Sequence, residues 1–346
     1  MFDFSKISEY KKIFSNLNNS GPIIIKKGKI SFYKDKKYIS SIENPSLKFL
    51  FNKKKDEIIL KGYFLGKKTF VNFEKLDNLK KFTVKIPAIN FISKIEMMEN
   101  ENKALVKFDK NRFTGFFDYK DDKITIKKGS LKNVFLDGKI NGDIIFSPYF
   151  DFVLNLDLNS FNFNRLYSHL FELNNYDEKK LFSLGGKING QINLSVNKIL
   201  SKYDLIKSLE SRLVLKNGSI LVNQLLLNLG KLGAADINGR ISNDINNRNF
   251  SFEKNIFIDN EKYFFRKFGI YNKENITNSL FVSGKFSLKN LKMHFNEISS
   301  SEKIKENDIN FIQKQFNIIL LSDGYRSLFN FPNLKGFVRL VLGESE

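Results

Sequence analysis

Apolar and polar residues alternate with a two-residue period along most of the chain, which is the pattern of a β-strand with one apolar face. The clearest example is VFLDGKINGDIIF at 134–146, where every second residue is apolar or Gly. Pro148 then marks a turn, and the alternation resumes at 152–158. The same phasing predicts further strands at 188–196, 235–241 and 280–288.

Some of these strand segments are similar to one another. GKINGDIIF at 138–146 matches GKINGQINL at 186–194, and KGSL at 128–131 matches KNGSI at 216–220 with one residue inserted. Repetition of this kind points to one structural unit used several times, although a biased composition also produces short matches. Strand patterns recur from about 23 to 295, with turn signals at all-β spacing, so we predict a mainly β fold.

A few stretches depart from the two-residue period. Leu166, Leu170 and Leu173 have helical spacing, and Asn162 is suited to be the N-cap of that helix. A weaker helix candidate covers 200–209. Beyond Phe295 the pattern predicts a linker at 299–301, a helix at 303–315, and strands at 316–321 and 335–342.

These patterns divide the chain into an N-terminal segment (1–20), a strand-rich region (21–295) and a linker with a mixed C-terminal segment (296–346). The N-terminal segment mixes polar and apolar residues and lacks the continuous apolar core of a signal peptide. No apolar run approaches the ~20 residues that a membrane span needs. We therefore expect neither a signal peptide nor a membrane anchor in this chain.

Composition adds a preference for sheet and a strong positive charge. The 346 residues include 37 Phe and 12 Tyr, which favour half-buried pleated surfaces. The net charge of +20 favours partners with phosphate, either nucleic acid or anionic lipid, although a codon bias towards Lys, Asn, Ile and Phe also explains it. Many lysines fall at predicted strand ends, so we expect solvated turns, with a headgroup surface or nucleic-acid binding as alternatives. The clusters are at 26–29, 34–37, 53–55, 67–68 and 127–128.

The sequence contains no arrangement typical of an active site. There is no Cys, which excludes disulfides, thiolate metal sites and Cys nucleophiles. His169 and His294 each fall on the polar side of their segment without a companion at metal-ligand spacing, so we expect surface histidines. No G-x-S-x-G, P-loop or G-x-G-x-x-G is present. Asp121 with Asp122, and DGYR at 323–326, predict turns, so we expect no enzyme activity, cofactor or metal.

Several short motifs resemble those of a known family. They are LKGYFLG at 60–66, LDGKING at 136–142, YFDF at 149–152 with LDL at 156–158, GGKING at 185–190, and LKNGSI at 215–220 leading to ING at 237–239. With them, the segment from about 57 to 295 resembles the AsmA-like proteins of Gram-negative envelopes, especially their C-terminal region. The chain departs from the family pattern because it lacks the N-terminal membrane anchor.

The resemblance implies a long antiparallel β-sheet curved into an apolar groove, with a few short helices. Members of the family are typically anchored in the inner membrane, extend into the periplasm, and take part in phospholipid transport and outer-membrane assembly without catalytic residues. The implied partners are phospholipid or another acyl-chain lipid, the membrane surface and an anchored envelope subunit, with no specific nucleic acid. A periplasmic location at the inner membrane is implied as well.

Two alternatives stay open from the residues alone. A β-sandwich would produce the same alternation, with the apolar face closed as an ordinary core, and a basic β-rich module for nucleic acid or another polyanion would explain the charge. For an open groove, we expect the lipid-facing lining to consist of Leu136, Ile140, Ile144, Phe146, Phe152, Leu154, Leu156, Leu158, Ile188, Ile192, Leu194, Ile237 and Ile241.

Overall fold

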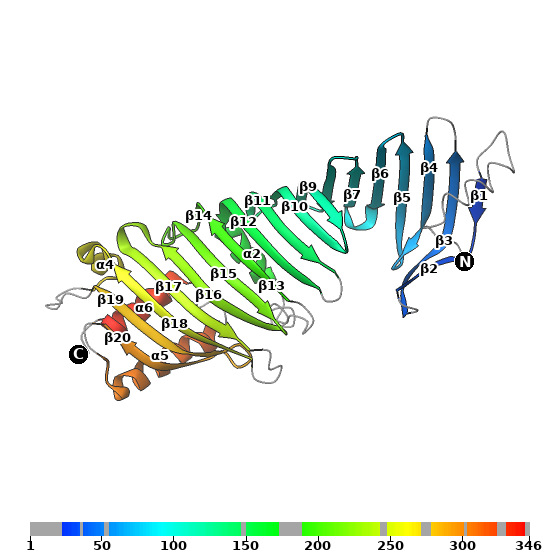
Figure 1. The fold of residues 1–346 in the computed structure, drawn as a ribbon. Coiled ribbons are helices and arrows are strands. Elements are labelled where there is room, and N and C mark those ends of the chain that lie inside the picture. Colours follow the sequence, from blue (N-terminus) through cyan, green and yellow to red (C-terminus); the bar gives the residue numbers. More distant parts are fainter. Residues whose placement is uncertain are drawn as a thin grey trace. The chain divides into compact units, whose positions relative to one another are not determined.

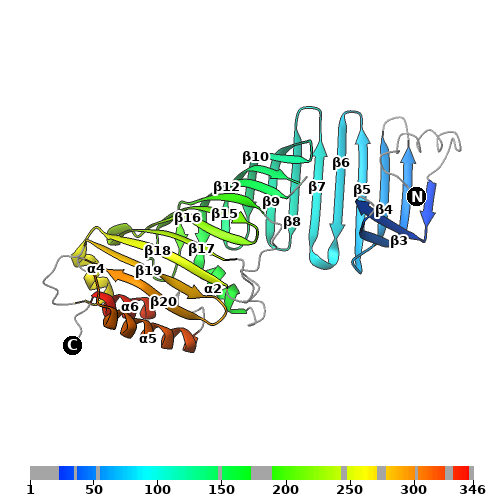
Figure 2. The same ribbon diagram turned by 60° about the horizontal axis from the view of Figure 1, so that its bottom comes forward.

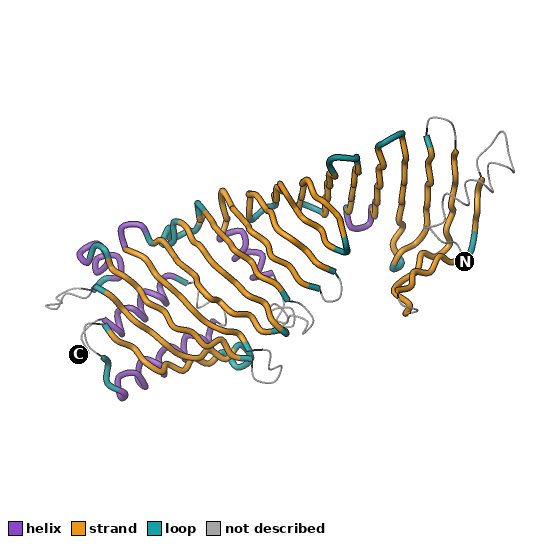
Figure 3. The backbone as a smooth tube through the Cα atoms, viewed as in Figure 1, coloured by secondary structure: helices purple, strands orange, loops and turns teal. Residues whose placement is uncertain are grey.

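The computed structural model describes residues 23–34, 37–51, 55–146, 150–172, 189–242, 248–270, 278–300, 303–323 and 330–342. Within these residues the protein is mainly β, with a mixed sheet of 20 strands and only a few short helices (Figures 1 and 3). The prediction of a mainly β fold is therefore confirmed. The described strands all belong to this sheet, so they do not form the two layers of a sandwich.

The chain divides into two compact units, here called the first unit (1–119 with 125–133) and the second unit (120–124 with 134–346). In the first unit, β1 and β2 both pair with β3, and each later strand to β9 pairs antiparallel with the one before it. Its strands are β1 (Ile23–Lys26), β2 (Lys29–Lys34), β3 (Lys37–Phe51), β4 (Asp56–Phe64), β5 (Lys67–Leu76), β6 (Leu79–Ile86), β7 (Phe91–Met97), β8 (Asn102–Phe108), β9 (Asn111–Lys120) and β10 (Lys123–Lys132).

The first unit has one apolar and one charged face, because alternate residues of each strand point to opposite sides. Its buried core lies at β3 and β4. On the charged face, Lys55 pairs with Glu57 at 3.3 Å and with Glu74 at 3.2 Å. One apolar cross-strand row is Phe49, Ile58, Phe73, Phe82 and Ile95, and one charged row is Glu57, Glu74, Lys81, Glu96 and Lys103.

The second unit contains the remaining strands and the helices that cover part of its sheet (Figure 2). The strands are β11 (Leu136–Ile145), β12 (Asp151–Asn162), β13 (Gly190–Val196), β14 (Ile199–Leu200), β15 (Ser208–Lys216), β16 (Ser219–Asn228), β17 (Gly233–Ile241), β18 (Asn249–Ile258), β19 (Ser279–Ser287) and β20 (Lys292–Ser299). The helices are α2 (Phe163–Glu172), α4 (Glu261–Phe268), α5 (Glu306–Asp323) and α6 (Phe331–Leu342).

The sheet of the second unit is mixed, whereas the family resemblance implied an antiparallel one. β12 pairs in parallel with β13 and β14, and the other pairs described in this unit are antiparallel. A parallel neighbour cannot be reached through a tight turn, and the chain leaves β12 through α2 before it returns at β13. The similar segments 138–146 and 186–194 thus contribute to β11 and β13, which both pair with β12 along its first part.

The helix predictions at 162–173 and 303–315 were right, because α2 and the first part of α5 lie there, and the prediction at 200–209 was wrong. α2 begins after Asn162, whose side-chain oxygen accepts the Arg165 N–H at 3.0 Å, as expected of an N-cap. The segment 200–209 is not a helix, because it contains the end of β14 and the start of β15. The strands predicted at 316–321 and 335–342 are also wrong, since these residues belong to α5 and α6.

The C-terminal helices form because their apolar residues follow helical spacing over a longer window. In α5, Ile312 and Leu320 are 3% and 0% exposed, and Phe316 packs against the same cluster. These residues are four positions apart, so they lie on one face of the helix. In α6, Val338, Val341 and Leu342 are buried. Short apolar runs such as FNIILL fit strands and helices equally well, and only the buried face distinguishes them.

Candidate apolar binding face

Cross-strand pairing places an almost wholly apolar surface on one side of the second unit, here called the apolar face. Because pairing partners point to the same side of a sheet, the register identifies its members strand by strand. They are Gly138, Ile140, Gly142 and Ile144; Phe152, Leu154, Leu156 and Leu158; Gly190, Ile192, Leu194 and Val196; Leu209, Ser211, Leu213 and Leu215; Ile220, Val222, Leu225 and Leu227; Gly233, Ala235, Ile237, Gly239 and Ile241; Phe250, Phe252, Lys254, Ile256 and Ile258; Leu280, Val282, Gly284 and Phe286; and Met293, Phe295 and Ile298.

Most residues predicted to line a groove lie on this face. They are Ile140, Ile144, Phe152, Leu154, Leu156, Leu158, Ile192, Leu194, Ile237 and Ile241.

The other predicted lining residues lie elsewhere. Leu136 lies beyond a register shift in β11 and packs against the cluster around Leu158. Phe146 follows the end of β11, is 44% exposed and contacts Phe150. Ile188 lies outside the described residues.

The sequence analysis missed the contribution of β15, β16 and β18 to this face. The signal was present, since SLESRLVLK at 208–216 and NFSFEKNIFI at 249–258 also alternate with a period of two. Each of these strands adds half-buried apolar residues, among them Leu213, Leu225 and Phe252.

The apolar face is closely covered at its ends and less in its middle. At the β19 and β20 end, residues of α4, α5 and α6 pack with it, and Leu280 and Ile298 are 1% and 0% exposed. Near α2, Leu158 and Val196 form a second buried cluster with Phe163. Between these clusters the residues are half-buried, and the principal contacts of the described helices with strands are those of α5 with β20 and α2 with β14. The half-buried residues here include Leu154, Leu156, Ile192, Leu194, Leu213, Leu225 and Ile237.

The opposite face of the same strands is polar and bound together by side-chain amides. Asn155 donates to the Oδ1 of Asn141 at 2.8 Å, and Asn193 donates to the Oδ1 of Asn155 at 2.7 Å. Gln191 donates to Asn193 at 2.9 Å and accepts from Arg212 at 3.3 Å. This ladder crosses β11, β12, β13 and β15, so one side of the sheet is suited to water and the other to apolar material.

A tight backbone contact keeps β11 and β12 close together at this face. Gly142 has a φ of 138°, and a Cβ atom there would lie 2.0 Å from the carbonyl oxygen of Val153. Only Gly meets both conditions without displacing the partner strand.

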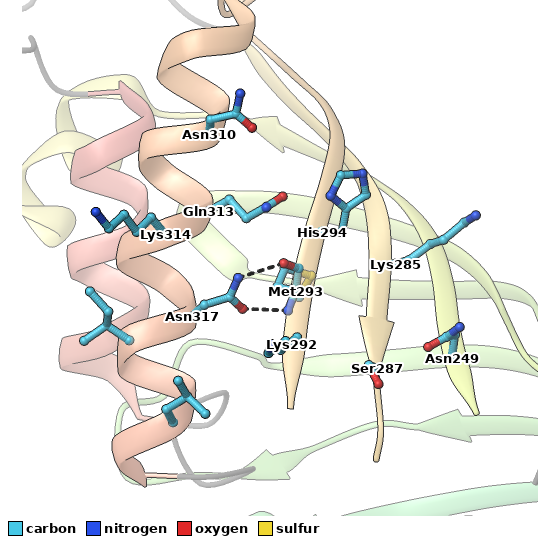
Figure 4. Close-up of a pocket in the computed structure, with 12 residues that line it drawn as sticks. Asn249, Lys285, Ser287, Lys292, Met293, His294, Asn310, Gln313, Lys314 and Asn317 are labelled. Carbon is cyan, nitrogen blue, oxygen red and sulfur yellow. Dashed lines mark hydrogen bonds between the residues drawn. The ribbon is translucent and has the colours of Figure 1, made fainter. Parts of the chain in front are cut away.

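Beside the edge strand β20, α5 lies along the sheet and fixes the strand by side-chain hydrogen bonds (Figure 4). Asn317 accepts the Met293 N–H at 2.7 Å and donates to the Met293 carbonyl at 2.9 Å. Gln313 accepts the Phe295 N–H at 2.9 Å. These bonds satisfy backbone groups that an edge strand leaves unpaired, which protects the edge from pairing with another chain.

A pocket of about 710 Å³ lies between α5 and the ends of β18, β19 and β20 (Figure 4). Lys285, Lys292, Lys314 and His294 are among its lining residues, so it is basic and open to water. His294 is exposed, as predicted, and the side chain of His169 lies outside what the structure describes.

The acidic pair and the lysine clusters at 26–29 and 67–68 lie where the sequence predicted, and the clusters at 34–37 and 53–55 lie partly outside the described residues. Asp121 and Asp122 form a turn with φ values of 49° and 59°. Lys67 and Lys68 are exposed where β5 starts after a turn. Lys127 and Lys128, however, lie inside β10, where Lys127 pairs with Asp118 at 2.7 Å. Their charges are solvated on a strand, because alternate residues of a one-sided sheet face water.

Among the described residues, no three His, Asp or Glu side chains are grouped as ligands for a metal ion. In the same part of the chain, no helix combines the length and the apolar character needed to cross a bilayer. No protein-family model and no curated protein sequence matched the chain.

Proposed function

We propose that this chain is a non-enzymatic envelope protein that binds or conducts phospholipid on the apolar face of its second unit. The main support is the half-buried middle of that face, which lies between two closely packed clusters. The motifs that resemble AsmA-like proteins support the same function. They extend the proposal to phospholipid passage between the inner and outer membranes, to outer-membrane assembly, and to a periplasmic location at the inner membrane.

Burial of an acyl chain on this face is energetically favourable and needs no chemical reaction. Each methylene moved from water onto an apolar surface contributes about 0.8 kcal/mol, so ten methylenes gain roughly 8 kcal/mol before the cost of ordering the chain. The acyl chain is buried against the apolar face, while the polar face of the same strands stays in water. No bond is made or broken in this process, so the proposed function requires no catalytic residue.

The test is the lipid content of the purified chain. The full chain is isolated under native conditions from bacterial envelopes, extracted with organic solvent, and the extract is analysed by mass spectrometry. We expect phospholipid in a fixed ratio to protein, and a large loss of it in Leu156→Gln combined with Leu194→Gln. Wild-type protein that contains no lipid and takes none up from phospholipid vesicles would contradict the proposal.

A basic module for nucleic acid or another polyanion is the second candidate. It is favoured by the net charge of +20 and by the lysines around the pocket beside α5. The two candidates use different regions of the second unit: the pocket is lined by exposed residues such as Lys285 and His294, and none of its lining residues lies in the half-buried middle of the apolar face. Duplex-DNA binding at physiological salt therefore separates them.

A further inference from the structure

One charged residue, Lys254, interrupts the apolar face. Among the strand positions that make up this face, Lys254 has the only charge and Ser211 is the only other polar side chain. On β18 it lies between Phe252 and Ile256, and its cross-strand partners are Ile237 and Val282. Lys254 thus lies on the apolar side of the sheet, where charge is otherwise excluded.

The position of Lys254 marks a boundary. On one side, Val282 and Ile298 are 4% and 0% exposed beneath the helices. On the other side, Ile237 and Leu225 are half-buried at the start of the open middle. Lys254 is itself half-buried, and it stands where the covered end meets the open part of the face.

Within the described residues, Lys254 has no hydrogen bond and no ion pair. Burial of its ammonium group lowers its pKa from the ordinary value of 10.5, because removal from water disfavours the charged form. A lysine that only extends its stem over apolar surface keeps its head in water and shows no such shift. The amine of Lys254 is therefore held away from water with no carboxylate of the described residues beside it, and a charge there is costly unless another group pairs with it.

We infer that Lys254 binds the anionic headgroup of an acyl-chain lipid, a carboxylate or a phosphate, whose chain lies along the open middle of the apolar face. From Lys254 the cross-strand row continues through Ile237, Leu225 and Ser211 to Leu194. Four strand spacings of about 4.8 Å give roughly 19 Å, the scale of a long acyl chain. This inference rests on the proposed lipid binding and adds the ligand class, an acidic lipid.

The experiment compares an acidic probe with its uncharged counterpart on the full chain. cis-Parinaric acid and its methyl ester are titrated by fluorescence into wild type, Lys254→Met, Lys254→Arg and Lys139→Met. Lys139 is the matched control, because it is an exposed lysine of the same sheet that lies on the opposite face of β11. Circular dichroism of each variant confirms that it is folded before binding is measured.

We expect wild type to bind the acid about tenfold more tightly than the ester, the scale of one charge-assisted hydrogen bond. Lys254→Met should lose this preference for the acid and keep ester binding, whereas Lys254→Arg and Lys139→Met should keep the preference. Equal affinity for acid and ester in wild type, or an unchanged preference in Lys254→Met, would overturn the inference and leave the apolar face as a general lipid site.

Two further outcomes separate the remaining readings. Wild type that binds neither probe would contradict the proposed function itself, and not merely the role of Lys254. Inorganic phosphate is added as a competitor for the acid. If phosphate displaces it at equal concentration, the site takes a free anion and the assignment to a lipid headgroup is wrong.

Discussion

Replacing Leu154 with Asp tests whether the middle of the apolar face is open. Leu154 is half-buried and lies between Gly142 and Ile192, whereas Leu280 on the same face is 1% exposed beneath the helices. If the middle is open, the new carboxylate can keep its water, and the loss is limited to part of one leucine's burial. Full burial of a leucine is worth about 1.5–3 kcal/mol, so Leu154→Asp should lower the free energy of unfolding by roughly 1 kcal/mol.

The same substitution under the helices should be much more damaging. Leu280→Asp loses the whole burial and leaves an unpaired carboxylate in an apolar environment, so we expect a loss of more than about 4 kcal/mol. That is a large part of the 5–15 kcal/mol typical of a domain. Val153→Lys, at the 46% exposed neighbour of Leu154 on the polar face, is the control and should change stability by about 0.5 kcal/mol or less.

The assay is urea denaturation followed by circular dichroism, paired with the lipid retained by each purified variant. Leu154→Asp should remain folded and lose lipid, while Val153→Lys should retain both. If Leu154→Asp unfolds as readily as Leu280→Asp, the middle of the face is a closed core and the reasoning from partial exposure is refuted.

Three further predictions follow from individual contacts. The pKa of Lys254 is lowered in the fold, so the unfolded chain binds more protons than the folded chain as pH approaches the ordinary value of 10.5, and stability should rise with pH towards that value. In urea melts, Lys254→Met should be more stable than wild type at neutral pH, and the difference should shrink as pH rises. A difference that stays constant with pH would contradict this. Asn317→Leu removes both hydrogen bonds to Met293 and should lower the free energy of unfolding by about 1–3 kcal/mol. Amide hydrogen exchange of β20 should be faster in this variant than in Asn310→Leu, the control at an exposed position of the same helix. Equal exchange in the two variants would contradict the role of Asn317 in protecting the edge strand. Duplex DNA should bind weakly and be released near physiological salt in a titration, whereas salt-resistant binding to one sequence would favour the polyanion candidate.

The strands were predictable from the sequence because their signal is local. Alternation at 136–145 and at 279–287 depends only on which residues face the core, and the structure forms β11 and β19 there. The N-cap at Asn162 was predictable for the same reason, since a cap acts within one turn of helix. The helices at 316–321 and 335–342 were missed because short apolar runs have no decisive period.

The candidate site needed information that no local pattern contains. The alternation of NFSFEKNIFI puts Lys254 in phase with Phe252 and Ile256, but its cross-strand partners Ile237 and Val282 are known only from the fold. The parallel pairing of β12 with β13 was equally hidden, because it depends on how the chain crosses after α2. Partial exposure of residues such as Leu194 depends on where the helices pack, which is a long-range property.

The most direct test of lipid binding on the apolar face is photo-crosslinking with a phospholipid that has a diazirine in its acyl chain. The full chain is irradiated with this lipid in vesicles, digested, and the labelled residues are identified by mass spectrometry. Labels should concentrate on Leu154, Leu194, Leu213 and Leu225, with few on Asn155 and other residues of the amide ladder. Equal labelling of both faces, or labelling confined to the lysine-lined pocket beside α5, would contradict the account.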